Sequence, residues 1–167
     1  EPFAADLLPG AMDGYTLPVS DGTEADRAGI RAATKLLTEA GWTVQDGVLK
    51  DAKGTPFAFE ILLVQGADEM ISIANIYIEA LKRLGIDAHV TTVDNAQDQE
   101  RTNAYDFDMT HYIRGLSLSP GNEQMLYWGS KGVTEPGTRN WMGMNSPAAE
   151  AMINTLLSST NKDDFVT

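Results

Sequence analysis

The sequence predicts an α/β fold with a central, mostly parallel sheet flanked by helices. Residues 57–64 are nearly all apolar, as expected for a strand that is covered on both faces, and residues 86–93 are predicted to form a second strand. Between them, residues 68–84 place apolar side chains at helical spacing. A strand, a helix and a second strand in this order form a βαβ unit, so we expect the two strands to be parallel with a right-handed crossover.

The composition fits one folded domain and excludes some classes of partner. The chain has 167 residues, 43% of them hydrophobic, which is enough to bury a core. Twelve Lys and Arg against 24 Asp and Glu give a net charge of −12, which repels phosphate backbones and anionic lipid headgroups. We therefore expect no nucleic-acid partner. Cysteine is absent, which excludes disulfides, and no apolar run approaches the roughly 20 residues of a membrane span.

A helix and a hairpin are predicted in the first third of the chain. Thr23 is a suitable N-cap, Asp26 fits the capping-box spacing, and Gly41 supplies the C-terminal stop. The apolar face of this helix comprises Ala25, Ala28, Ala32, Ala33, Leu36, Leu37 and Ala40. A β-hairpin follows, and its turn is predicted at Asp46-Gly47.

The helix between the two apolar strands has clear end signals. Asp68 is placed to cap its N-terminus, Lys82 and Arg83 favour the last turn, and Gly85 ends it. The predicted core face comprises Met70, Ile73, Ala74, Tyr77, Leu81 and Leu84.

The second half of the chain predicts fewer regular elements. A short helix is expected over residues 96–103 and a third strand over residues 106–112. Residues 114–145 are rich in Gly, Pro and Ser and predict a long loop, which inside a compact domain is usually functional. Ser146 caps a last helix with Pro147 at its first position. The apolar face of that helix comprises Met152, Ile153, Leu156 and Leu157.

The chain carries no recognisable catalytic motif. It has no HExxH, GxxxxGK, GxGxxG or GxSxG segment, so we expect it not to be an enzyme. His89 and His111 each lie on a predicted strand without a third metal ligand at a suitable spacing, and we interpret them as ordinary strand residues. Asp106 and Asp108 would point the same way from a strand, and we favour a structural role for both. No catalytic residue, metal site or cofactor is therefore predicted.

The long loop combines flat apolar side chains with hydrogen-bonding groups. These are the components of a site for a small organic or peptide ligand. The residues that carry them are Tyr112, Arg114, Tyr127, Trp128, Arg139, Asn140 and Trp141. Both tryptophans could instead anchor the loop to the core, an alternative that is weaker for Trp141 because Arg139 and Asn140 precede it.

Several segments together resemble one protein family. Residues 31–42, RAATKLLTEAGW, are similar to the "A..LL.eAGW" helix of the oligopeptide- and dipeptide-binding proteins of ABC importers, the family 5 extracellular solute-binding proteins. Residues 47–62 resemble the hairpin and strand that follow it in that family, residues 78–86 its "L..lGI" helix end, and residues 105–109 its "yDfdm" strand. Each motif is weak alone, and their order and spacing make the combined resemblance strong.

Within the family, the chain resembles most the subgroup associated with uptake of microcin C and related peptides. The shared stretches are YTLPVSDG at residues 15–22, LSPGNEQ…WGS at residues 118–130 and GTRNWMG at residues 137–143. They include most of the aromatic loop, so the resemblance and the residue chemistry indicate the same region.

The resemblance implies a fold, a function and a location. It implies a lobe like those of type II periplasmic binding proteins, with residues 1–22 as an extended connection and residues 23–167 as the C-terminal lobe of a two-lobed protein cut at both ends. It implies capture of oligopeptides or peptide-like compounds outside the cytoplasmic membrane, in the periplasm or on a lipid anchor. The expected partners are an ABC permease and its ATPases, with a monomeric binding protein.

One position departs from the family pattern. Typical oligopeptide and dipeptide binders have an Asp a few residues before a Pro, and this Asp pairs with the free N-terminus of the ligand. Aligned on Pro120, it should fall near Leu116 or Ser117, where this chain has no acidic residue. Either another carboxylate, such as Glu123 or Asp108, replaces it, or the ligand has no free amino group there.

These considerations leave one set of expected ligand contacts and two alternative functions. The contacts are Tyr112, Arg114, Leu116, Ser117, Glu123, Arg139, Asn140 and Trp141. The same scaffold could bind a non-peptide ligand, such as a metal chelate, a heme or an opine. It could also serve as the ligand-sensing domain of a regulator.

Overall fold

The computed structural model describes the greater part of the chain. The described residues are 10, 13, 14, 16, 17, 19, 26–115 and 117–166. They divide into two compact units. The sheet unit comprises residues 15–98 and 107–111, and the loop unit comprises residues 1–14, 99–106 and 112–167. The predicted connecting segment, residues 1–22, lies almost entirely outside the described residues.

The centre of the sheet unit is a three-stranded parallel sheet. Its order is β4 (Asp87–Val93), β3 (Ala58–Val64), β5 (Met109–Thr110), with β3 in the middle. The pairing of β3 with β4 runs from Ala58 opposite Asp87 to Val64 opposite Val93. The predicted α/β class and the parallel pairing of these two strands are therefore confirmed.

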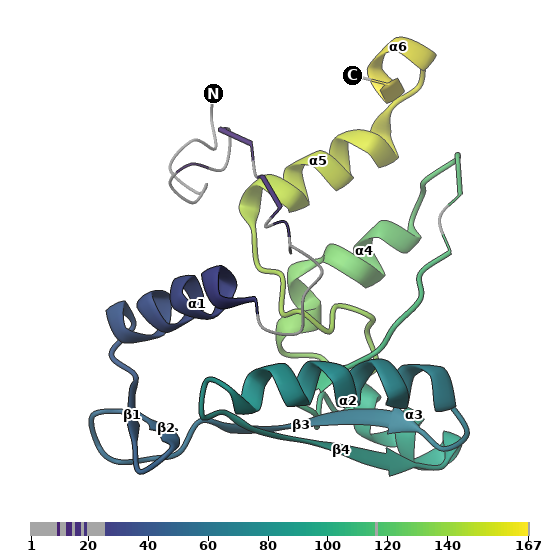
Figure 1. The fold of residues 1–167 in the computed structure, drawn as a ribbon. Coiled ribbons are helices and arrows are strands. Elements are labelled where there is room, and N and C mark those ends of the chain that lie inside the picture. Colours follow the sequence, from purple (N-terminus) through teal and green to yellow (C-terminus); the bar gives the residue numbers. More distant parts are fainter. Residues whose placement is uncertain are drawn as a thin grey trace. The chain divides into compact units, whose positions relative to one another are not determined.

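The helix α2 (Asp68–Lys82) packs against one face of the β3–β4 pair, as Figure 1 shows. The buried cluster between them comprises Leu49, Ile61, Leu63, Ala74, Ile78, Leu81, Ile86 and Ala88. Two features of the predicted helix were wrong. Ile78 is buried, whereas Ile73 is 52% exposed and Tyr77 is 43% exposed. The N-cap position is Ala67, and Asp68 is the first helical residue. Because α2 is apolar on more than one side, periodicity alone did not fix which side meets the sheet.

The third strand is much shorter than the predicted range 106–112. The reason lies in a side chain, because the carboxylate Oδ2 of Asp108 accepts a hydrogen bond from the backbone N–H of Glu60 at 3.0 Å. That donor is thereby satisfied without a strand partner. Thr110 then donates through Oγ1 to the carbonyl of Leu62 at 2.9 Å. The structural role favoured for Asp108 matches this contact, although Asp108 precedes the strand.

The hairpin and the first helix follow the predicted order. In α1 (Arg27–Glu39), Asp26 is itself the N-cap, since its side chain accepts from the Gly29 N–H at 2.8 Å. Asp26 was therefore wrongly placed inside the helix, and Thr23 lies outside the described residues. No residue of α1 is fully buried, but Leu37 of its predicted apolar face is partly buried and packs against the core cluster, whereas Leu36 is 65% exposed. The hairpin of β1 (Thr43–Gln45) and β2 (Val48–Lys50) turns at Asp46 and Gly47, both with positive φ, as a two-residue turn requires.

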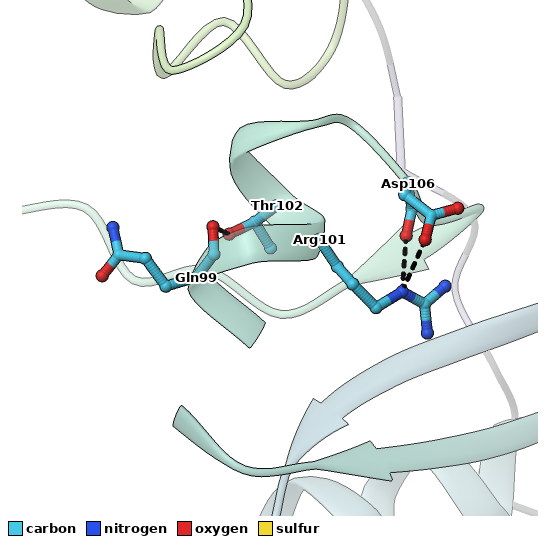
Figure 2. Close-up of polar contacts among 4 residues, drawn as sticks. All are labelled: Gln99, Arg101, Thr102 and Asp106. Carbon is cyan, nitrogen blue, oxygen red and sulfur yellow. Dashed lines mark hydrogen bonds and ion pairs between the residues drawn. The ribbon is translucent and has the colours of Figure 1, made fainter. Parts of the chain in front are cut away.

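The loop unit begins at the end of α3 (Asn95–Asn103), a helix that was predicted. Arg101 donates through Nε to both the carbonyl and the carboxylate of Asp106, at 3.0 and 2.9 Å, and this pair closes the turn after the helix (Figure 2). Thr102, which is 4% exposed, donates to the carbonyl of Gln99 in the same view. Asp106 therefore has the structural role that was favoured for it. It fills that role through an ion pair within the turn, and it is not part of a strand.

The predicted loop, residues 114–145, contains two helical segments. These are α4 (Glu123–Trp128) and the 3-10 helix η2 (Ser130–Val133). The prediction of a long irregular loop was therefore wrong over those residues, because six residues between glycines are too few for a visible helical period. The last helices are α5 (Pro147–Ser158), capped by Ser146 Oγ as predicted, and α6 (Lys162–Val166). Of the helices in the described part of the chain, none has the length and apolarity that a membrane span requires.

Candidate functional site

The loop unit contains an aromatic pocket with a volume of about 390 Å³. It is lined by Tyr112, Arg114, Tyr127, Trp128, Arg139, Trp141 and Met142. The first two come from the segment after β5, the next two from the C-terminal end of α4, and the last three from the segment before α5. Three stretches that are distant in sequence therefore form one pocket.

Tyr127 is the centre of this aromatic pocket and contacts both arginines. It is 8% exposed, and the guanidinium carbon of Arg114 lies 3.7 Å from its ring centroid. Arg114 also stands 5.1 Å from the ring centroid of Trp128. Arg139 donates through Nη1 to the Tyr127 hydroxyl at 2.9 Å. Cation–π contact and a hydrogen bond thus hold two positive charges beside one ring.

The hydroxyl groups of Tyr112 and Tyr127 form a hydrogen-bonded pair that shifts both pKa values. The hydrogen bond with Tyr112, followed by the one from Arg139, lowers the pKa of Tyr127, while the same tyrosine pair raises the pKa of Tyr112. The two hydroxyl oxygens are 3.4 Å apart. Tyr112 also meets Trp141 edge-on, with ring centroids 4.7 Å apart. The rings therefore form a fixed wall of the pocket.

A second, more polar pocket of about 410 Å³ adjoins the first and shares Arg114 and Tyr127 with it. Its other lining residues are Gly115, Ser117, Ser119, Pro120, Glu123 and Gln124. Arg114 donates through Nη2 to the side-chain oxygen of Gln124 at 3.2 Å. An aromatic pocket and a polar pocket on either side of one arginine can together hold an elongated ligand with different groups along its length.

Glu123 is the acidic residue of the polar pocket. Its Oε1 accepts from the backbone N–H of Gly121 at 2.9 Å and from the Gln124 side chain at 3.2 Å. The Gly121 hydrogen bond is the main cause that lowers the pKa of Glu123, and the positive charge of Arg114 adds to it. The carboxylate is therefore ionised at neutral pH.

Asn140, an expected ligand contact, lines neither pocket. It is 1% exposed, and its amide nitrogen donates to the carbonyls of Gly129 and Met144 at 3.0 and 2.8 Å. Its Oδ1 accepts from the Met144 N–H at 2.8 Å. These bonds join the end of α4 to the segment before α5, so Asn140 fixes the backbone that carries its neighbours Arg139 and Trp141.

The structure therefore brings together most of the predicted site residues. Tyr112, Arg114, Arg139 and Trp141 line the aromatic pocket, and Ser117 and Glu123 line the polar one. Leu116 lies outside the described residues. The lining residues that were not among the expected contacts include Gln124 and Met142. No local pattern marks Gln124, because α4 is too short for a visible helical period.

Comparison with known proteins identifies the family. The model of the bacterial extracellular solute-binding proteins, family 5 Middle, matches residues 3–135, which is well over half of the chain. The chain belongs to this family. Family 5 consists of binding proteins of ABC transporters, so the resemblance seen in the sequence is confirmed.

Individual family 5 relatives cover the chain almost completely. A Brucella melitensis protein named as a binding protein, BMEII0691, is 42% identical over 166 residues, which is 99% of this chain and 27% of the relative. The peptidoglycan-binding protein YepA of Agrobacterium fabrum is 39% identical over 163 residues, 96% of this chain and 25% of YepA. The chain thus spans about a quarter of the length of these relatives.

A solved family 5 structure shares the fold. The oligopeptide-binding protein AppA of Bacillus subtilis, in complex with a nonapeptide, superposes with a TM-score of 0.68 at 26% identity and covers 81% of this chain and 27% of AppA. The expected likeness to a lobe of a type II periplasmic binding protein is therefore confirmed.

The two histidines of this family 5 chain line neither pocket. His89 is exposed on β4, in register with Glu60. His111 is exposed just after β5, so its predicted place on a strand was wrong. Within residues 26–115 and 117–166, no three His, Asp or Glu side chains form a group that could hold a metal ion.

Glu150 supports the pocket from α5. Its Oε1 accepts from both the N–H and the hydroxyl of Ser130, at 2.6 and 2.8 Å, and these bonds lower its pKa, the backbone one most. A lowered folded-state pKa means that the stabilisation is complete above the ordinary value of 4.5 and is lost as the pH falls through the folded value.

We expect Glu150→Gln to lower the free energy of unfolding by about 1 kcal/mol at pH 7, since the group is only half-buried. The difference from the wild type should shrink below pH 4.5. Urea titrations at pH 7 and at acid pH measure it. Glu135→Gln is the matched control, because the backbone carbonyl of Glu135, and not its carboxylate, accepts from Tyr105. A difference that is constant with pH would contradict the assignment.

Proposed function

We propose that this chain is the C-terminal lobe of the substrate-binding component of an ABC importer, which captures oligopeptides or peptide-like compounds outside the cytoplasmic membrane. The full-length protein would reside in the periplasm or on a lipid anchor and would deliver its ligand, as a monomer, to a permease and its ATPases. Nucleic acid is not among the proposed partners. Passive capture, with no chemical step, fits a family of binding proteins.

The observation that carries this proposal is the pair of adjoining pockets in a family 5 chain. The aromatic pocket offers flat apolar surface, and the polar pocket offers hydrogen-bonding groups and a carboxylate. A peptide needs both, because its side chains are often apolar while its main chain and termini are polar. AppA was solved in complex with a nonapeptide, and YepA is named for peptidoglycan, so related proteins support peptide-like ligands.

Glu123 is the better of the two carboxylates proposed for a ligand ammonium group. Asp108 already accepts a hydrogen bond from the backbone of Glu60. Glu123 lines the polar pocket, and both of its hydrogen bonds are accepted by Oε1. It lies three positions after Pro120, whereas the family pattern has an Asp before the proline, so its approach to the ligand would differ.

Binding of short peptides by the full-length protein tests this function. Pools of peptides of two to nine residues should raise its melting temperature, because a ligand that binds only the folded state stabilises it. Trp141→Ala should weaken the tightest peptide by about tenfold or more, since aromatic side chains at the centre of a site dominate binding. Tyr77→Ala removes a 43% exposed aromatic ring of α2 and is the control.

The outcomes separate the proposal from its alternatives. The absence of any thermal shift with every peptide pool would count against peptide capture. Mass spectrometry of the compounds that co-purify with the full-length protein would then reveal a chelate, a heme or an opine. We also expect the 167-residue chain alone to bind peptides poorly, because one lobe buries too little ligand surface. Micromolar peptide affinity of the isolated chain would contradict that expectation.

A further inference from the structure

The aromatic pocket holds two guanidinium groups and no carboxylate in its lining, while Glu123 lies with Arg114 in the polar pocket. Within the described ranges, Arg114 and Arg139 form no ion pair, whereas Lys35, Lys82 and Arg101 each pair with an acidic side chain. The acidic groups of the chain outnumber the basic ones two to one, 24 against 12. What sets these two arginines apart is that both line one pocket whose lining contains no acidic side chain.

The surroundings of the two arginines make a counter-ion favourable. Arg114 is stacked on Tyr127, and its Nε is buried without a hydrogen-bond partner among the described residues. Arg139 is exposed and donates to the Tyr127 hydroxyl, which uses only part of its N–H groups. Arg114 is half-buried against aromatic rings, so its guanidinium loses part of its solvation, which an anion can replace. Guanidinium groups match the planar, two-oxygen geometry of a carboxylate.

We infer that the aromatic pocket binds a carboxylate of the ligand through Arg114 and Arg139, with the apolar group next to that carboxylate against Trp141. The inference rests on the proposed function in one respect, that this pocket is a ligand site. It adds a charge to the substrate class. Peptides with a carboxylate that reaches this pocket are preferred, and amidated or neutral counterparts are discriminated against.

The competing explanation is that the arginines only brace the rings. Arg114 over Tyr127 and Arg139 on its hydroxyl would then be complete as they stand, and the pocket would accept neutral aromatic groups equally well. The two explanations differ in one measurable quantity, the ratio of affinities for a carboxylate and for the matching amide.

A matched pair of small probes measures this ratio on the 167-residue chain itself. N-acetyl-L-phenylalanine and N-acetyl-L-phenylalaninamide differ only in the charged group. Titrations are followed by the indole N–H signals of the three tryptophans in ¹⁵N-labelled protein. Trp128 and Trp141 line the pocket and should shift, whereas Trp42, which packs against Phe57 in the sheet unit, should not.

We expect the carboxylate probe to bind about 10- to 100-fold more tightly than the amide, because hydrogen bonds between charged groups are stronger than those to a neutral amide. Arg114→Gln and Arg139→Gln should each reduce that ratio toward one, and Arg31→Gln, an exposed residue of α1 that lines neither pocket, should preserve it. Equal affinities in the wild type, no binding of either probe, or a ratio that survives both arginine substitutions would overturn the inference.

The source of the carboxylate is resolved with the full-length protein and three tetrapeptides. Ala-Ala-Gln-Ala and its C-terminal amide test the peptide terminus, and Ala-Ala-Glu-Ala against Ala-Ala-Gln-Ala tests an acidic side chain. The pair that shows the tenfold or larger difference identifies the source, and no difference in either pair rejects a carboxylate site. If neither tetrapeptide pair differs in affinity but peptides still bind, the carboxylate site is rejected and the proposed function stands. The titration with the small probes does not depend on the proposed function.

Discussion

Replacing Asn140 by leucine is expected to lower the free energy of unfolding of the loop unit by about 3 kcal/mol, because buried polar groups left without partners cost about 1–3 kcal/mol each. The substitution keeps the size of the side chain but removes its bonds to Gly129 and Met144. The aromatic pocket should lose its shape as well, since Asn140 lies between Arg139 and Trp141. Urea unfolding, followed by tryptophan fluorescence, measures the loss.

A local measurement makes the Asn140 prediction specific. The amide hydrogen of Met144 should exchange much faster in Asn140→Leu, because its acceptor is the Asn140 side chain. Asn154→Leu, at an exposed position of α5, is the control and should change stability by less than about 0.5 kcal/mol. An unchanged unfolding midpoint together with a protected Met144 amide would show that the bonds of Asn140 contribute little.

The second large effect is expected in the core of the sheet unit. Leu63, on the central strand β3, is 4% exposed and belongs to the cluster beneath α2. Leu63→Ala should lower the free energy of unfolding by about 2–5 kcal/mol, because a buried leucine leaves a cavity that close-packed neighbours fill only in part. The midpoint of urea unfolding, followed by circular dichroism, measures this effect.

A leucine-to-alanine substitution at an exposed position of the sheet unit separates the effect of burial from the effect of removing the side-chain atoms. Leu36 is 65% exposed on α1, so Leu36→Ala removes the same atoms without opening a cavity. It should change stability by less than about 0.5 kcal/mol. If the two leucine variants lost similar stability, the buried cluster beneath α2 would not be the main source of stability of the sheet unit.

The sequence predicted best the elements whose signals are local. The strand β3, the crossover helix and β4 were found because apolar composition and helical spacing act within one element. The stops at Gly41 and Gly85 follow from single residues, both of which adopt positive φ in the structure. Ser146 and Pro147 likewise begin α5 as predicted, because a cap needs only its own first turn.

The errors arose where a distant residue decides the local structure. The strand β5 shortens because Asp108 bonds the backbone of Glu60, which is 48 positions away in the chain. The buried side of α2 includes Ile78 because the sheet selects one of several apolar sides of the helix. Helix α4 was overlooked because it is held by contacts with α5 and η2 and not by its own length. The residue pattern within a single element does not show which distant residues will contact it.

The same distinction applies to the function. By itself, the sequence determined the α/β class, the family and the identity of the aromatic and arginine residues, because these depend on residue types and their order. Only the tertiary structure decided that Arg114 and Arg139 meet at Tyr127 while Asn140 is buried and bonds to Gly129 and Met144. Tyr127 and Arg139 are 12 positions apart, and their contact depends on how α4 packs and how the following segment returns over it. The energy of such contacts depends on segments that are brought together only in the folded chain, so no single stretch of sequence predicts them.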